Sequence, residues 1–127
     1  MSKNLKPEDF IASYPNIFKK GMPRSGFYSG PGWNIILDTL CPILEHHVLS
    51  LPQELQADIY VVQVKEKFGG LRFYMNQSTP YMDGAISMAE NLSYSICEQC
   101  GAPGTRGGSG YVQTLCAKHR KAKDKKK

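Results

Sequence analysis

The sequence has no apolar run approaching eighteen residues, which excludes a helix that crosses a bilayer, and we expect no membrane partner. The first residues, Met1 to Lys6, have no apolar segment behind them, so we expect no secretion signal and a cytoplasmic location. The fingerprints of a P-loop, a dinucleotide-binding turn and a nucleophile elbow are also missing. With none of these catalytic signatures, we expect a protein that is not an enzyme.

The net charge of +5 is not spread evenly along the chain. Residues 118–127 hold seven Lys or Arg and one Asp, whereas residues 1–117 hold nine basic and ten acidic side chains. The folded part is therefore close to neutral, and the basic character belongs to a tail. A short lysine-rich tail attracts any polyanion without specificity, and it is also common as a solubilising or frayed terminus. Charge alone leaves both explanations open.

Four metal-ligand side chains form two pairs, Cys97-x-x-Cys100 and, fifteen residues later, Cys116-x-x-His119. Three thiolates and one imidazole suit tetrahedral Zn²⁺, and a spacing of two lets one short turn supply two ligands. A disulfide or free thiols would explain the cysteines less well, because Cys41 would have no partner and nothing points to an oxidising compartment. Since all four ligands are protein groups, no coordination position is open to substrate, so we expect a structural zinc.

Residues 1–32 are predicted to form an irregular N-terminal arm, because four prolines and four glycines interrupt every periodic pattern. Within the arm, a short helix is expected from Pro7 to Ser13. From residue 33 onward apolar residues recur at three- and four-residue steps, which indicates a helix with one buried face. Pro42 is expected to kink or interrupt this helix, and Pro52 ends it. The buried face consists of Trp33, Ile36, Leu37, Leu40, Cys41, Leu44, Val48 and Leu51.

Residues 59–76 are predicted to form a β-hairpin with its turn at Gly69-Gly70. Glu66 falls by alternation on the core side, where a carboxylate needs a bulge, an edge position or a basic partner. The core face carries Val62, Val64, Phe68, Leu71, Phe73 and Met75. The opposite face carries a basic cluster with one aromatic, formed by Lys65, Lys67, Arg72 and Tyr74.

A second long helix is predicted to begin at Pro80 with Thr79 as its N-cap and to lead into Cys97. Its buried stripe comprises Met82, Ala85, Ile86, Ala89, Leu92 and Ile96. The segment 116–119 is expected to open a last helix. The predicted fold is α+β: a helix–β-hairpin–helix core over residues 33–96, a treble-clef-like zinc module over residues 97–120, and a disordered basic tail over residues 121–127.

Three blocks of the sequence resemble a group of small, uncharacterised bacterial and bacteriophage proteins. The blocks are Gly32-Trp33, the segment Val64–Tyr74, and the two ligand pairs with their flanks in residues 97–104 and 115–119. The resemblance extends over roughly residues 30–120. It implies a phage or prophage setting, a zinc-binding end and a life in the cytoplasm of the infected cell. It implies no particular activity.

Two catalytic explanations are disfavoured by the histidines. HNH-type nucleases also use a treble clef, but their catalytic histidine lies on the hairpin, and residues 101–118 contain none. His119 is committed to the metal. His46 and His47 are adjacent on the first long helix, where a surface or capping role is expected in preference to proton transfer.

Three functions remain as expectations. Basic residues interleaved with an aromatic suit phosphate contact and base stacking, so the leading prediction is DNA or RNA binding. An ordinary solvent-exposed strand face would explain the same pattern of residues. The alternative is an inhibitor or adaptor of a bacterial host enzyme that docks through exposed aromatics. The third is a nucleotide-binding sponge, in which the glycine-rich loop 104–110 cradles an anion, although a flexible loop also explains it. The nucleic-acid site would comprise Lys65, Lys67, Arg72, Tyr74 and Arg106, with the tail.

Overall fold

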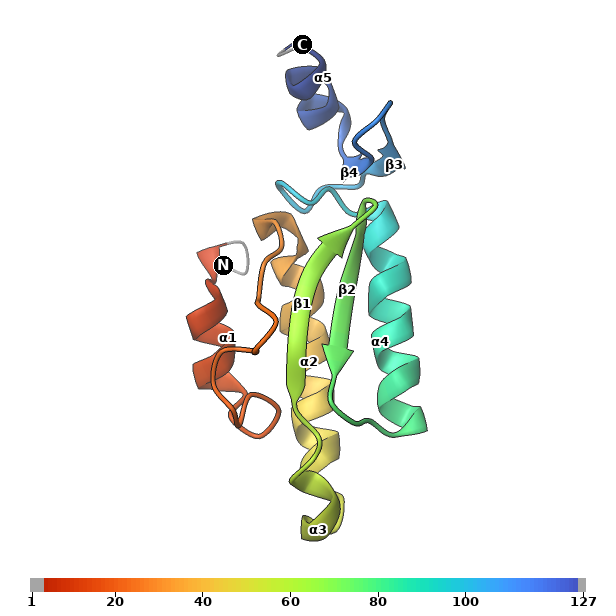
Figure 1. The fold of residues 1–127 in the computed structure, drawn as a ribbon. Helices are drawn as coiled ribbons and strands as arrows, with labels where there is room; N and C mark the ends of the chain where they lie inside the picture. Colours follow the sequence, from red (N-terminus) through yellow and green to blue (C-terminus); the bar gives the residue numbers. More distant parts are fainter. Residues whose placement is uncertain (1–3, 126–127) are drawn as a thin grey trace.

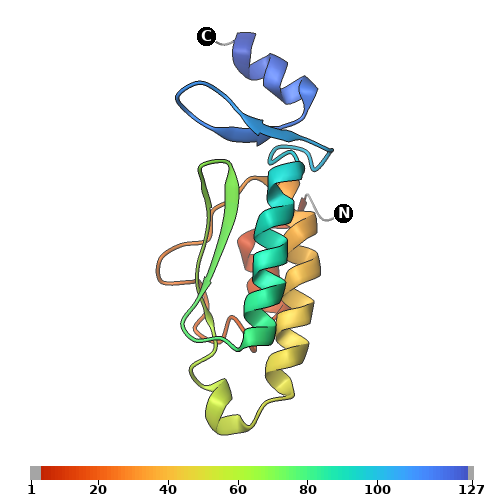
Figure 2. The same ribbon diagram turned by 90° about the vertical axis from the view of Figure 1, so that its right-hand side faces the viewer.

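The computed structural model describes residues 4–125. A two-stranded hairpin lies in front of α2, with α1 on one side and α4 on the other (Figure 1). The second hairpin and α5 lie beyond the turn of the first hairpin, at one end of this core (Figures 1 and 2). The elements in chain order are α1 (Pro7–Ser13), η2 (Pro31–Trp33), α2 (Asn34–Leu49), α3 (Gln53–Gln56), β1 (Val61–Lys67), β2 (Gly70–Met75), α4 (Pro80–Leu92), η3 (Ser93–Ser95), β3 (Thr105–Gly107), β4 (Gln113–Leu115) and α5 (Ala117–Lys125). The predicted α+β class is confirmed.

The centre of the core is the apolar face of α2. The predicted stripe is buried from Trp33 to Val48, and Leu51 is half-buried. The helix continues through Pro42 without interruption. Proline removes one backbone hydrogen bond, and the buried residues on both sides of Pro42 hold the helix together across that gap. No helix within residues 4–125 is both long and apolar enough to cross a membrane.

The turn of the first hairpin lies at Phe68-Gly69, one residue earlier than predicted, because Lys67 pairs with Gly70. Both turn residues have positive φ, 53° at Phe68 and 82° at Gly69, as a type I′ turn requires. Gly70 is needed in the strand itself, since a Cβ there would lie 2.6 Å from the Tyr94 ring. The prediction that Phe68 belongs to the core is wrong. As a turn residue it is 62% exposed.

The start of β1 also departs from simple alternation. The register shifts between Val61 and Gln63, which is a bulge. As a result Val61 is buried and Val62, predicted to be core, is only half-buried. Of the remaining core face, Val64, Leu71 and Phe73 are buried as predicted, and Met75 is half-buried.

The N-terminal arm covers the outer edge of β1. The Tyr28 N–H donates to the Val64 carbonyl at 2.8 Å, and the Val64 N–H donates to the Gly26 carbonyl at 3.0 Å. Phe27 thereby forms an isolated parallel bridge with Val64. The arm contains α1 at the predicted residues, but it also supplies a strand-like segment to a strand edge that would otherwise expose its backbone.

Side chains from α4 and η3 satisfy the outer edge of β2. The Leu71 N–H donates to the Ser93 hydroxyl at 2.9 Å, and the Phe73 N–H donates to the Glu90 carboxylate at 2.9 Å. α4 begins as predicted, with the Thr79 hydroxyl accepting from the backbone of its first turn. Leu92, predicted to be buried, is 46% exposed because it faces a groove between α2 and α4.

Candidate metal centre

The four predicted ligands converge at one point. Cys97 and Cys100 come from the loop after η3, Cys116 directly precedes α5, and His119 lies in its first turn. Their ligand atoms all lie within 4.8 Å of one another. The N–H of Gly101 donates to the Cys97 carbonyl at 2.9 Å, which closes the tight turn of the first pair.

The distances between donor atoms match a tetrahedral metal such as zinc. With zinc–sulfur bonds of about 2.3 Å and zinc–nitrogen bonds of about 2.0 Å, two sulfurs stand roughly 3.8 Å apart and a sulfur and a nitrogen roughly 3.5 Å apart. The Sγ atoms of Cys100 and Cys116 are 3.7 Å apart. His119 Nδ1 lies 3.5 Å from the Cys97 sulfur and 3.2 Å from the Cys116 sulfur. The His119 ring therefore presents Nδ1 as its ligand atom.

The backbone around the site favours thiolates at two of the cysteines. At Cys116, the N–H of His119 is the main cause that lowers the pKa of the thiol. At Cys97, burial alone would raise the pKa, but N–H groups of the surrounding loops outweigh it and lower the pKa. A thiolate is the form that binds a metal, so the fold prepares these ligands for coordination.

The metal loop packs closely on the start of α2. The Gly32 N–H donates to the Glu98 carbonyl at 2.6 Å, and the Trp33 indole N–H donates to the Ile96 carbonyl at 2.9 Å. A Cβ on Gly32 would lie 2.0 Å from the Cys97 carbonyl oxygen. Only glycine allows this approach, which gives a physical reason for the Gly32-Trp33 pair that the sequence singled out without explaining it.

Two side chains of α5 donate hydrogen bonds to the backbone of the glycine-rich β3–β4 hairpin. The Arg120 guanidinium donates to the carbonyls of Thr105, Gly107 and Gln113 at 2.7 to 2.9 Å. Lys123 donates to the Tyr111 carbonyl at 2.9 Å. Arg120 and Lys123 thus bind carbonyls of the hairpin, and Arg106 of the loop itself donates to the Phe68 carbonyl, which favours a structural role for the loop over an anion cradle.

The prediction of a disordered tail over residues 121–127 is wrong for residues 121–125. α5 extends to Lys125, so residues 121–125 are helical. The contacts of Arg120 and Lys123 with the hairpin explain why the helix continues. Residues 126–127 lie outside the described residues.

Two residues of the predicted nucleic-acid site, Arg72 and Arg106, contact Tyr94, which the sequence did not single out. Arg72 lies opposite Lys65 across the strands and donates to the Tyr94 hydroxyl at 3.1 Å. Arg106, from the second hairpin, lies 5.0 Å above the same ring and donates to the Phe68 carbonyl at 2.7 Å.

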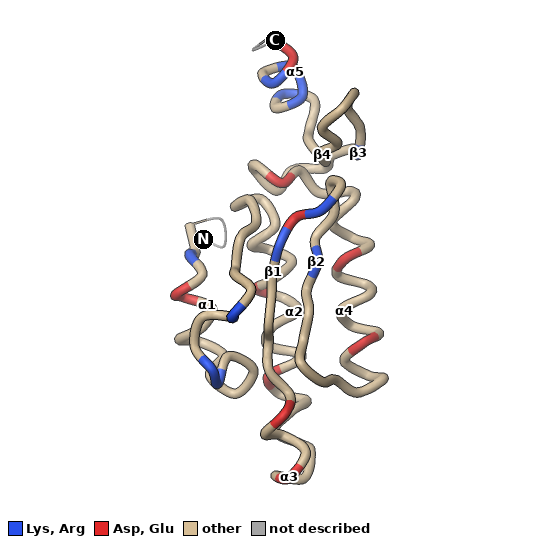
Figure 3. Tube along the Cα trace, in the orientation of Figure 1, with Lys and Arg blue, Asp and Glu red and all other residues tan. Residues whose placement is uncertain are grey.

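Two further members of the predicted site lie on the same hairpin. Lys67 is exposed with its ammonium 5.7 Å from the Phe68 ring, and Tyr74 is 40% exposed. The basic residues of β1 and β2 lie together near the turn, and a second basic group lies on α5 (Figure 3). We define the hairpin cluster as Lys65, Lys67, Arg72, Tyr74 and Arg106. Because Arg106 belongs to the second hairpin and bonds to the turn of the first, the cluster spans the boundary between the core and the metal module.

Glu66 lies on the core side of the hairpin, as alternation predicted, and is half-buried. Its carboxylate accepts the Gly69 N–H at 2.7 Å and the Tyr111 hydroxyl at 3.3 Å. Its negative charge raises the pKa of Tyr111. The bulge of β1 lies at Val61–Gln63, away from Glu66. The partners of the Glu66 carboxylate are a backbone amide and a tyrosine hydroxyl, where a basic residue was one of the predicted possibilities.

The two helix histidines have the contacts expected of surface and capping residues. His47 Nε2 lies 3.0 Å from the Thr79 hydroxyl, and its ring stacks on Tyr81 with centroids 4.4 Å apart. His46 is exposed. Both contacts of His47 stabilise the start of α4.

The fold and the site define the class of protein: an α+β protein with a Cys₃His cluster near its carboxyl end that fits a metal such as zinc. Comparison with family models, curated proteins and solved structures yields no match.

Proposed function

We propose that this chain is a small, phage-associated, non-enzymatic zinc protein that binds nucleic acid through the hairpin cluster. The observation that carries the proposal is the convergence of Arg72 and Arg106 on Tyr94, with Lys65 and Lys67 on the same strand pair. Two guanidinium groups and two ammonium groups from separate elements form one basic surface, which suits a run of phosphates.

Exposed aromatic rings around this surface favour single-stranded DNA or RNA. Phe68, at the turn, is 62% exposed with the Lys67 ammonium 5.7 Å from its ring, and Tyr74, on β2, is 40% exposed. Aromatic rings beside a basic groove provide stacking surfaces for unpaired bases, worth about 1–3 kcal/mol per base.

In this proposal the metal is a structural zinc in a treble-clef-like module. The turn at Cys97–Cys100, the β3–β4 hairpin and the start of α5 supply the three parts of such a module. The four protein ligands complete a tetrahedron, so the zinc would hold Arg106 against the first hairpin instead of binding substrate. Elemental analysis of freshly purified, reduced protein is expected to give one zinc per chain, and Cys116→Ser is expected to abolish it.

Matched charge reversals test the nucleic-acid site. Lys65→Glu with Lys67→Glu changes the hairpin cluster, and Lys121→Glu with Lys125→Glu makes the same change in net charge on α5. With a single-stranded oligonucleotide at physiological salt, we expect the hairpin pair to weaken binding more than tenfold, with a salt slope smaller by about 0.7 per lost phosphate contact. The α5 pair is expected to have a smaller effect. Equal losses for both pairs would show non-specific attraction and contradict the proposal.

The exposure of Tyr28 also suits the alternative function, an inhibitor or adaptor that docks on a host protein. That function predicts capture of one host protein that survives nuclease treatment and the α5 charge reversal but is lost in Tyr28→Ala. Under the nucleic-acid proposal, Tyr28→Ala leaves oligonucleotide binding unchanged, because Tyr28 lies outside the hairpin cluster, and no host protein is captured after nuclease treatment.

A further inference from the structure

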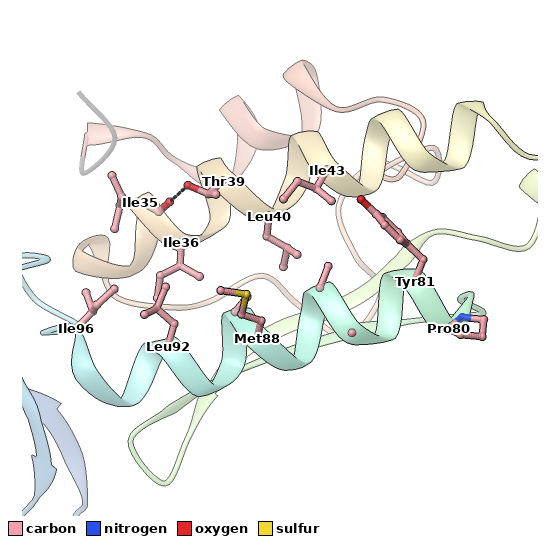
Figure 4. A pocket seen from close by; sticks show the side chains of 13 residues that line it. Ile35, Ile36, Thr39, Leu40, Ile43, Pro80, Tyr81, Met88, Leu92 and Ile96 are labelled. Atoms are coloured by element: carbon pink, nitrogen blue, oxygen red, sulfur yellow. Dashed lines mark hydrogen bonds between the residues drawn. The ribbon is translucent and has the colours of Figure 1, made fainter.

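An apolar groove of about 500 Å³ runs between α2 and α4 (Figure 4). None of the thirteen residues that line it is charged. Thr39, one of its few polar groups, already donates its hydroxyl to the Ile35 carbonyl. Five large side chains at its rim are between 39% and 74% exposed: Ile35, Ile43, Tyr81, Met88 and Leu92.

This concentration of apolar surface is unusual for the molecule. Twelve large apolar side chains are exposed within residues 4–125, and five of them line this one groove. Single exposed apolar residues are normal on a protein surface, whereas a contiguous apolar patch marks a surface that something covers.

We propose that a second copy of this chain covers the groove, so that the chain forms a symmetric dimer through α2 and α4. A twofold axis places identical surfaces against each other, so any net charge on the patch would repel itself. α2 and α4 carry no Lys or Arg. An uncharged, self-complementary surface suits a copy of itself and offers nothing to orient a charged partner.

The acidic residues of these helices are engaged away from the groove. Glu45 accepts the backbone and side-chain N–H groups of Asn16, and Asp38 accepts the Tyr14 hydroxyl, both on the α1 side. Glu90 accepts the Phe73 N–H on the β2 side. Asp83, at the start of α4, does not line the groove.

The exposed area matches what a dimer needs. With roughly 200 Å² for a large side chain, the five exposed fractions amount to about 500 Å² per copy, or about 1,000 Å² for the pair. A specific interface begins at about that size. Gly84 adds a hollow, since nothing lies within 4 Å of where its Cβ would be. Met88, 74% exposed and one turn further along α4, is the side chain that would fill the hollow of the partner copy.

The two helices run in opposite directions, since Ile35 and Leu92 mark one end of the groove and Ile43 and Tyr81 the other (Figure 4). Two such pairs facing each other form a four-helix arrangement. The outer face of the hairpin, seen from the front in Figure 1, lies outside this interface (Figure 2). The inference therefore does not depend on the proposed function.

Sedimentation equilibrium of full-length, zinc-loaded, nuclease-treated protein tests the dimer. The mass is expected to rise with concentration from 14.2 kDa to twice that value, with little dependence on salt because the interface is uncharged. Met88→Glu places a charge in the interface and is expected to weaken the dimer at least about 100-fold. Leu55→Glu, at a 52% exposed apolar residue on α3 outside the groove, is the control and is expected to leave the dimer unchanged.

Circular dichroism and zinc content verify that both variants fold. A wild-type protein that remains a monomer up to submillimolar concentration overturns the proposal. A dimer that Met88→Glu and Ile43→Glu leave intact also overturns it, as does a monomer whose groove takes up an apolar helix from another protein.

Discussion

Gly32 is the residue at which the metal loop and the core come closest. Gly32→Ala would force its Cβ to within 2.0 Å of the Cys97 carbonyl, so the loop has to move and the ligands with it. We expect zinc affinity to fall at least about tenfold, since changes to groups that orient metal ligands typically cost about 10- to 100-fold in affinity. Competition with a chromogenic chelator measures this. Gly107→Ala in β3, whose Cβ would meet only Arg120 at 3.9 Å, is the control and is expected to bind zinc normally.

The Cys41 thiol lies in the apolar core, apart from the three cysteines of the metal cluster. It is fully buried on α2, and burial, followed by the nearby charges of Asp38 and Glu45, raises the pKa of its thiol. A raised pKa and no solvent access both suppress alkylation. With a chelator present at pH 8, mass spectrometry is expected to find three modified cysteines in the native protein and a fourth only in denaturant. Modification of all four in the native protein at one rate would contradict a core that survives loss of the metal.

At the scale of elements, Thr114 links β4 to the first hairpin. Its side chain is fully buried, and its hydroxyl donates to the Gly69 carbonyl at 2.6 Å. Thr114→Val keeps the shape but removes the donor, so we expect the free energy of unfolding to fall by about 1–3 kcal/mol. Denaturant titration measures it. Thr105→Val, at an exposed position in β3, is expected to change stability by less than about 0.5 kcal/mol.

The elements that the sequence predicted correctly are those specified by local patterns. The stripe from Trp33 to Val48 follows helical periodicity, and Thr79 with Pro80 marks the start of α4. The metal ligands follow from spacing alone, because two residues between ligands fit one turn.

What the sequence could not predict depends on contacts between distant residues. The hairpin turn lies at Phe68-Gly69, and Gly70 is in the strand instead, where the Tyr94 ring from another element lies against it. The arm becomes strand-like at Phe27 because β1 offers a free edge. In the same way, Arg72 and Arg106 come from different hairpins and both contact Tyr94. No local sequence pattern could predict that these two arginines share a partner.

At the scale of the whole molecule, the core and the metal module have separate sources of stability. The main apolar cluster is drawn from residues 10 to 89, and within residues 4–125 Ile96 is the only later apolar side chain packed against it. The segment from Cys97 to Lys125 has few buried apolar side chains, so we expect its fold to depend on a bound metal. Chelation is therefore expected to remove hydrogen-exchange protection from residues 97–120 while α2, β1 and β2 keep theirs. Loss of protection throughout the chain would show that the core also needs the metal.

The central claim is that the hairpin cluster binds nucleic acid, and amide chemical shifts of the zinc-loaded, full-length protein test it most directly. Titration with a single-stranded oligonucleotide at physiological salt is expected to shift the amides of residues 63–74, with Tyr94 and Arg106, more than those of α5. Shifts confined to α5, or none at all, would contradict the claim. They would mean that the basic surface of the hairpin faces water or a protein instead.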